Sequence, residues 1–231
     1  MLSLIQFLDQ AKTYNVIPIV KRLFSGTETP IGIYQKLAGT NPDTFLLESA
    51  EQGVWGRYSF IGVASRGQLT ATGTTATWHG DCDALPDGAA LSEQPMKALE
   101  QLQTAWTSSP VDFPLSSGLV GFLSWGAVNL IESLPEPKEA EYEIPLYGFN
   151  QFSQLVVLDH QKSEILLVSV VFIDGEDLST AHARALSEVA ELERRVAMAT
   201  PAILTEPRWP EPEARPNTKE EDFLERVELA K

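Results

Sequence analysis

Apolar residues recur at the three- and four-residue spacing of an amphipathic helix in several stretches of the chain. This spacing predicts helices over residues 3–11, 29–37, 93–106 and 178–199. Ser3 is a suitable N-cap for the first helix, and Pro30 is tolerated in the first turn of the second. Each helix therefore has one apolar face that another element must cover.

Short runs of β-branched and aromatic residues predict strands before and between these helices. The dipeptide Gly73-Thr74 is typical of a hairpin turn. Gly121, inside a predicted strand, indicates a bulge or a close approach of another backbone. Two runs are almost continuously apolar, so we expect them at the buried centre of a sheet. These two runs are 152–158 and 165–172, and the others are 16–20, 44–49, 58–63, 68–72, 75–78 and 118–123.

Most of these strands follow one another as hairpins and do not alternate singly with helices. This order predicts an α+β fold with a largely antiparallel β-sheet core and flanking helices. Five prolines between residues 201 and 216 disfavour a helix there and favour an extended linker. Thr218 and Glu221 then match a capping box, so a new helix is expected. We predict a domain over 1–200, a Pro-rich linker over 201–217 and the truncated first helix of another domain over 218–231.

Composition narrows the classes of partner. The 231 residues carry a net charge of −15, which argues against binding to nucleic acid or to anionic membrane surfaces. Cys82 is the one cysteine and cannot form an internal disulfide, and no apolar run is long enough to span a membrane. We therefore expect a cytoplasmic protein. The three histidines have no partner at metal-ligand spacing, so no metal site is expected.

Two short blocks, Phe45-Leu46-Leu47-Glu48-Ser49 and Arg57-Tyr58-Ser59-Phe60-Ile61-Gly62, together resemble the N-terminal region of anthranilate synthase component I. The stretches 118–122 and 155–160 also resemble strands of that chorismate-using family. The chain departs from the family pattern at Ser124-Trp125-Gly126 and Asn129, where relatives carry an aspartate and an arginine. The resemblance implies the N-terminal part of the anthranilate synthase component I fold.

Glu48 is the sharpest candidate for a functional side chain. Residue types alone favour a structural ion pair between Glu48 and Arg57 at a strand end, because a carboxylate there needs a cationic partner. The resemblance instead implies that Leu47, Glu48 and Ser49 line a tryptophan feedback site, with Arg57 beside it. Asp159-His160 is interpreted as a turn between strands and not as catalytic.

The resemblance also implies a function for the whole protein of which such a region is part. Anthranilate synthase converts chorismate and ammonia to anthranilate and pyruvate in tryptophan biosynthesis. It needs Mg²⁺ and a glutamine amidotransferase subunit as the ammonia source. Catalytic residues are expected in the missing chorismate-binding domain and none in this chain, so the chain alone is predicted to be inactive.

Two other interpretations remain open from the sequence. One is a stand-alone module of the same fold that senses an amino acid or binds a partner subunit. The other is the N-terminal region of aminodeoxychorismate synthase component I, which shares the architecture.

Overall fold

The computed structural model describes residues 1–49, 56–134, 143–200, 216 and 218–231. The chain divides into two units, Met1–Thr200 and Pro201–Lys231. The described residues of the first unit form a seven-stranded antiparallel sheet with helices packed on it. Apart from residue 216, the predicted linker at 201–217 lies outside the described residues.

Each predicted helix and strand of the first unit is present, but the strand predicted at 16–20 extends to residue 24 and the one predicted at 152–158 begins at residue 147. Residues 58–63 and 68–72 belong to a single long strand and not to two, because the chain continues through an irregular stretch without leaving the sheet. The helices are α1 (Leu4–Gln10), α2 (Pro30–Leu37), α3 (Pro95–Ala105) and α4 (Leu178–Val196), and a 3₁₀ helix, η2, covers Trp125–Leu130. The strands are β1 (Val16–Phe24), β2 (Phe45–Glu48), β3 (Tyr58–Thr72), β4 (Thr75–His79), β5 (Leu119–Leu123), β6 (Tyr147–Asp159) and β7 (Glu164–Phe172).

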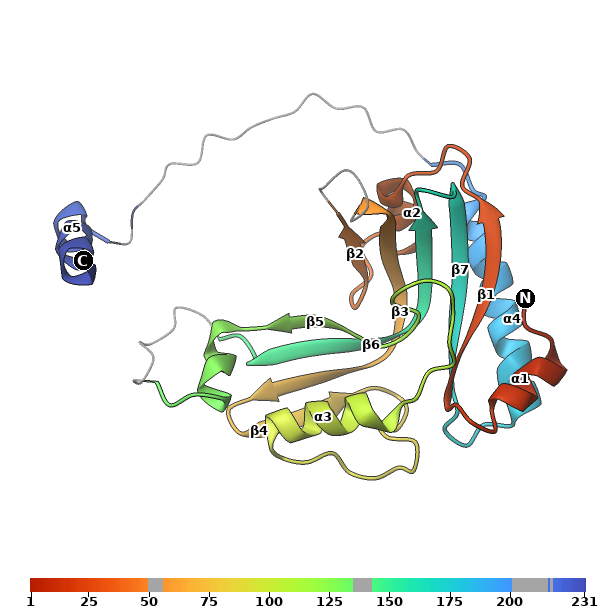
Figure 1. Cartoon of the computed structure of the whole chain (residues 1–231), viewed down its shortest axis with the longest axis horizontal. Helices are drawn as coiled ribbons and strands as arrows, with labels where there is room; N and C mark the ends of the chain where they lie inside the picture. The colour runs from red at the N-terminus through yellow and green to blue at the C-terminus, as the bar shows by residue number, and fades with distance from the viewer. Residues whose placement is uncertain (50–55, 135–142, 201–215, 217) are drawn as a thin grey trace. The chain divides into compact units, whose positions relative to one another are not determined.

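The long strands β3 and β6 connect two halves of the sheet. In the first half the strand order is β1-β7-β6-β3-β2, while β4 pairs with β3 and β5 pairs with β6 in the second half. The register of β3 on β6 shifts between Gly62 and Gly67, and β3 turns from one half into the other (Figure 1). Such irregularities bend a strand and increase its twist. All strand pairs are antiparallel, which confirms the α+β fold with an antiparallel core.

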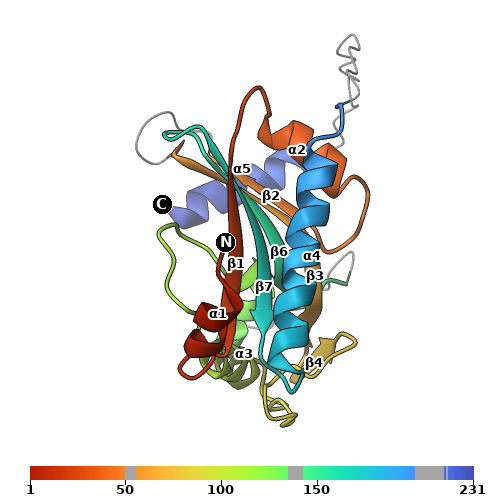
Figure 2. The ribbon, with the colours of Figure 1, turned by 90° about the vertical axis from the view of Figure 1, so that its right-hand side faces the viewer.

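Helices α1, α2 and α4 cover one face of the first half. Figure 2 shows α4 lying along the sheet, with α2 near one end and α1 near the other. Their apolar faces and the facing strand residues form one buried cluster, as the helical spacing requires. Strands β6 and β7 lie inside the strand order and are almost wholly buried, which confirms their predicted central position. The fully buried members include Phe7, Ile17, Ile33, Ile61, Val156, Leu167 and Val189.

The opposite face of the first half and the face beneath α3 hold two further apolar clusters. In the second half, β5 lies so close to β6 that a Cβ on Gly121 would be 1.8 Å from the carbonyl oxygen of Gly148. This contact confirms that Gly121 marks a close backbone approach. Tyr147 is buried below α3 and donates a hydrogen bond of 2.7 Å to the carbonyl of Pro95.

The second unit contains α5 (Glu220–Ala230). The predicted capping box at Thr218 and Glu221 is wrong in position, because the N-cap is Lys219 and its side chain makes no capping hydrogen bond. Within the described parts of the chain, no helix combines the length and apolar content needed to cross a bilayer.

Candidate functional site

Leu47, Glu48 and Ser49 lie at the end of the edge strand β2. Strand β2 is last in the sheet order, and it pairs with β3 so that Leu47 is opposite Phe60 and Glu48 is opposite Ser59. All three side chains are exposed, and residues 50–55, which follow them, lie outside the described residues. The three residues are thus presented at a sheet edge, where backbone groups on the outer side face away from the ladder.

Phe45 fixes this short strand in place. Its ring occupies the space above Gly62, where a Cβ would be 2.1 Å from the ring, and meets the ring of Phe152 edge-on at 5.7 Å. Because only glycine fits beneath the ring, Gly62 and Phe45 set the register of β2 on β3. That register determines where Glu48 lies.

Strand alternation places Leu47 and Glu48 on opposite faces of the sheet. Phe45 packs into the cluster remote from α2 and α4, whereas Leu46 packs into the cluster beneath those helices. Successive side chains of a strand point to alternate faces, so Leu47 shares the face of Phe45 and Glu48 that of Leu46. A ligand that touches both side chains must therefore lie across the end of β2.

Arg57 is paired with Asp159 and not with Glu48. Its Nε is 3.0 Å from Asp159 Oδ1 and its Nη2 is 2.6 Å from Oδ2. The guanidinium also lies 4.7 Å from the centre of the Tyr58 ring. The structural alternative of a Glu48–Arg57 ion pair is therefore wrong. Asp159 is the stronger partner for Arg57 because each of its carboxylate oxygens accepts a hydrogen bond from a different guanidinium nitrogen.

The carboxylate of Asp159 is buried and is stabilised in its charged form. The hydrogen bonds from Arg57 lower the pKa of Asp159, and the backbone N–H groups of Lys162 and Gln161 lower it further. In return, Asp159 raises the pKa of Arg57. The bonds to Gln161 and Lys162 close the turn between β6 and β7, which confirms that Asp159-His160 forms a turn.

Ser59 and His160 add a second link at the same end of the sheet. The hydroxyl oxygen of Ser59 is 2.7 Å from the ring Nε2 of His160. The backbone N–H of His160 donates to the backbone carbonyl of Arg57 at 2.8 Å. Ser59 is buried, so the link ties the β6–β7 turn to the start of β3. The sequence alone does not connect these residues. Two sequence features could have indicated these contacts. Asp159-His160 directly follows one predicted strand, and Arg57 directly precedes another.

Glu48 is left with a carboxylate that makes no ion pair or side-chain hydrogen bond to any described residue. An exposed anion at a strand end can accept a charge-assisted hydrogen bond from an ammonium group. Among the residues that the structure describes, no three His, Cys, Asp or Glu side chains gather as a metal site would need.

Known proteins resemble this chain over most of its length. Anthranilate synthase component 1 of Arthrobacter globiformis is 34% identical over 227 residues, which cover 90% of this chain and 42% of that protein. The protein of the same name from Mycolicibacterium smegmatis is 32% identical over 229 residues, covering 96% and 43%. The chain therefore spans less than half the length of these curated relatives. No protein-family model matches it.

A solved structure shares the fold. The crystal structure of anthranilate synthase component I from Streptococcus pneumoniae superposes with a TM-score of 0.53. The matched region covers 78% of this chain and 38% of that protein, at 16% sequence identity. This likeness supports the architecture of the first unit.

Proposed function

We propose that this chain, which resembles anthranilate synthase component 1 over most of its length, is the amino-terminal region of a chorismate-using enzyme of tryptophan biosynthesis. The observation that carries the proposal is 34% identity to a named relative across 90% of the chain. In the whole enzyme, chorismate and ammonia would give anthranilate and pyruvate, with a glutamine amidotransferase subunit as the ammonia source. Chorismate and Mg²⁺ would be bound by residues beyond those of this chain.

The strand end at Leu47, Glu48 and Ser49 is proposed as part of a tryptophan feedback site. Support comes from the exposed carboxylate of Glu48, which makes no ion pair to any described residue, and from Leu47, which is 43% exposed on the other face of β2. An aromatic amino acid lying across the strand end would place its ammonium at Glu48 and its indole against Leu47. Tryptophan bound there would inhibit by favouring one arrangement of the whole protein, which requires a difference in affinity between two states.

Arg57 has a supporting part in this proposal. Its charge is satisfied by Asp159, so it offers no strong attraction to the carboxylate of a bound amino acid. Instead, the pair holds the start of β3, which is the strand that positions Glu48 through the Glu48–Ser59 pairing. Arg57 thus acts through the position of β2 and β3.

A binding titration on the full chain tests the site. We expect tryptophan to move the backbone amide signals of Leu47, Glu48 and Ser49 in a ¹H–¹⁵N NMR titration, with weak affinity. Glu48→Gln keeps the size of the side chain and removes its charge. It should weaken binding about tenfold, because a charge-assisted hydrogen bond becomes a neutral one.

Glu100→Gln is the matched control, since Glu100 is an exposed carboxylate on α3 and lies outside the proposed site. It should leave tryptophan affinity unchanged. Signals of Leu47 to Ser49 that stay still up to the solubility of tryptophan would contradict the proposed site. Equal weakening by both substitutions would show a general charge effect instead.

A further inference from the structure

A cavity of about 480 Å³ lies between α3, strands β5 and β6, the start of β1 and the end of β7. Its walls are mostly apolar and aromatic, and the exposed residue Gln103 stands at its rim. Its volume is within the range of small-molecule sites. The lining includes Leu99, Leu102, Trp106, Leu119, Phe149 and Phe172.

One buried polar atom in this wall has no hydrogen-bond partner among the residues that the structure describes. Gln151 is 2% exposed and lines the cavity, and its Oε1 is buried without a hydrogen bond to any described residue. Side chains two apart on a strand share a face, so Gln151 lies on the same face of β6 as Phe149 and Tyr147. That face is the one covered by α3, where Tyr147 and Phe149 contribute to the apolar cluster.

A buried amide oxygen without a hydrogen-bond partner is costly, because it has lost its hydrogen bonds to water without replacement. Buried polar groups are nearly always paired in native proteins, so an exception calls for a specific explanation. The amide of Gln151 offers an acceptor at Oε1 and two donors at Nε2. A group inside the cavity with one donor and one acceptor would satisfy both ends.

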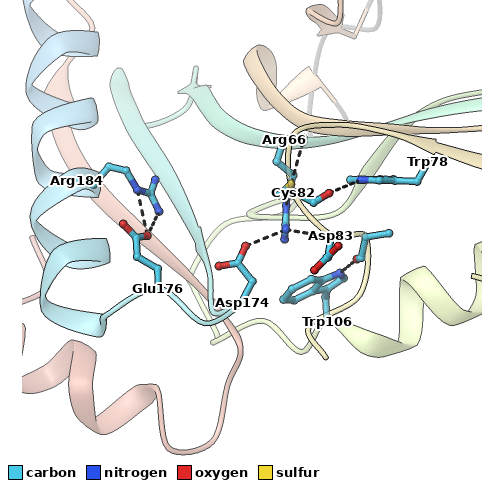
Figure 3. A network of polar contacts seen from close by, with 9 residues as sticks. Arg66, Trp78, Cys82, Asp83, Trp106, Asp174, Glu176 and Arg184 are labelled. Atoms are coloured by element: carbon cyan, nitrogen blue, oxygen red, sulfur yellow. Dashed lines mark hydrogen bonds and ion pairs between the residues drawn. The ribbon is translucent and has the colours of Figure 1, made fainter. Parts of the chain in front are cut away.

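The aromatic wall of the cavity is held in place from behind. The indole N–H of Trp106 donates to the carbonyl of Ala84 at 2.9 Å, and the Trp106 ring meets Phe172 edge-on at 5.2 Å. The guanidinium of Arg66 stacks on both rings, at 4.8 and 4.5 Å from their centres. Figure 3 shows Arg66 joined to Asp174 and Asp83 above Trp106. A wall fixed in this way loses little freedom when a ligand binds.

We propose that this cavity binds a flat, mostly apolar heteroaromatic molecule that carries an N–H group beside a carbonyl, with Gln151 as its polar partner. The aromatic walls provide contact area. The Gln151 amide would accept a hydrogen bond from the ligand N–H at Oε1 and donate one to the ligand carbonyl from Nε2. The site is separate from Leu47, Glu48 and Ser49, which lie on β2 in the first half of the sheet.

Two compounds of nearly equal shape test the proposal on the unaltered chain. 2-Quinolone carries the N–H beside its carbonyl, whereas coumarin has a ring oxygen in place of that N–H. We expect 2-quinolone to bind about tenfold more tightly, because coumarin leaves Oε1 unpaired and facing another oxygen. In ¹H–¹⁵N NMR spectra, the signals that move should be those of the Trp106 indole, the Gln151 amide and the Leu119 backbone.

Gln151→Leu should remove the preference, so that the variant binds 2-quinolone and coumarin with about equal affinity. The matched control is Gln154→Leu, three residues along β6 and outside the cavity lining, which should keep the preference. Three results would each overturn the proposal: no signal changes with either compound, equal affinities in the unaltered chain, or changes confined to Leu47–Ser49. These readouts stand even if Gln151→Leu does not fold.

Discussion

Arg57 and Asp159 form a two-point ion pair that joins the residue before β3 to the last residue of β6. The two residues are 102 positions apart in the sequence. The carboxylate is 3% exposed at its side chain, while the guanidinium is 31% exposed. This pair, with the Ser59–His160 contact, closes the end of the sheet from which the candidate site projects.

Asp159→Asn should lower the free energy of unfolding by about 1–3 kcal/mol, because the buried end of a charged pair is lost while Arg57 remains. The asparagine oxygen can still accept hydrogen bonds from the backbone N–H groups of the turn. The lost stability therefore measures mainly the contribution of the ion pair with Arg57. Urea unfolding followed by circular dichroism measures it. Asp87→Asn, at an exposed position, is the control and should have little effect. Identical midpoints for Asp159→Asn and the unaltered chain would show that the pair contributes no stability.

The same pair should make stability depend on pH in the acid range. Arg57 lowers the pKa of Asp159 in the folded state below its unfolded value of about 3.9. A lowered folded pKa contributes stability that is complete above the unfolded pKa and is lost as pH falls through the folded pKa. The stability difference between the unaltered chain and Asp159→Asn should be constant from about pH 7 to 5 and shrink below about pH 4. A difference that grows on acidification would contradict this assignment.

Gly121→Ala should disrupt the pairing of β5 with β6. The new methyl group would stand 1.8 Å from the Gly148 carbonyl oxygen and 2.7 Å from the Phe149 Cα, and backbone atoms cannot rotate away. We expect a loss of about 1–3 kcal/mol, typical of overpacking, in thermal or urea unfolding. Gly126→Ala is the control, since its nearest neighbour at 3.3 Å is the flexible end of the Leu146 side chain. Equal stability of the two variants would contradict the close approach.

On the proposed function, the catalytic residues are expected outside this chain, so the chain alone should not form anthranilate from chorismate, ammonium and Mg²⁺. Anthranilate fluorescence measures this directly, and the expected signal equals the blank without protein. The full-length Arthrobacter globiformis relative in the same buffer verifies that the assay works. A signal above the blank that increases with chain concentration would overturn the prediction.

The elements of this fold could be predicted because their signals are local. Helical spacing, the Ser3 cap and Pro30 at the start of α2 depend on neighbours a few residues apart, and the structure places them as predicted. The family blocks around Leu47 and Arg57 were likewise readable without coordinates. The continuity of β3 was not, because its irregular stretch between Gly62 and Gly67 looks like a break when only the residue types are known.

The pairing of charges was decided by the tertiary structure. Sequence proximity favoured Glu48 as the partner of Arg57, but the antiparallel pairing of β3 with β6 brings Asp159 beside Arg57. In the same way, no local signal shows that Gln151 lines a cavity with its Oε1 bonded to no described residue, because that depends on what α3 and β5 place opposite it. The sequence by itself determined most of the elements, the fold class and the family resemblance. The tertiary structure decided which charged and polar groups meet, since contacts between distant segments depend on sheet register and helix packing.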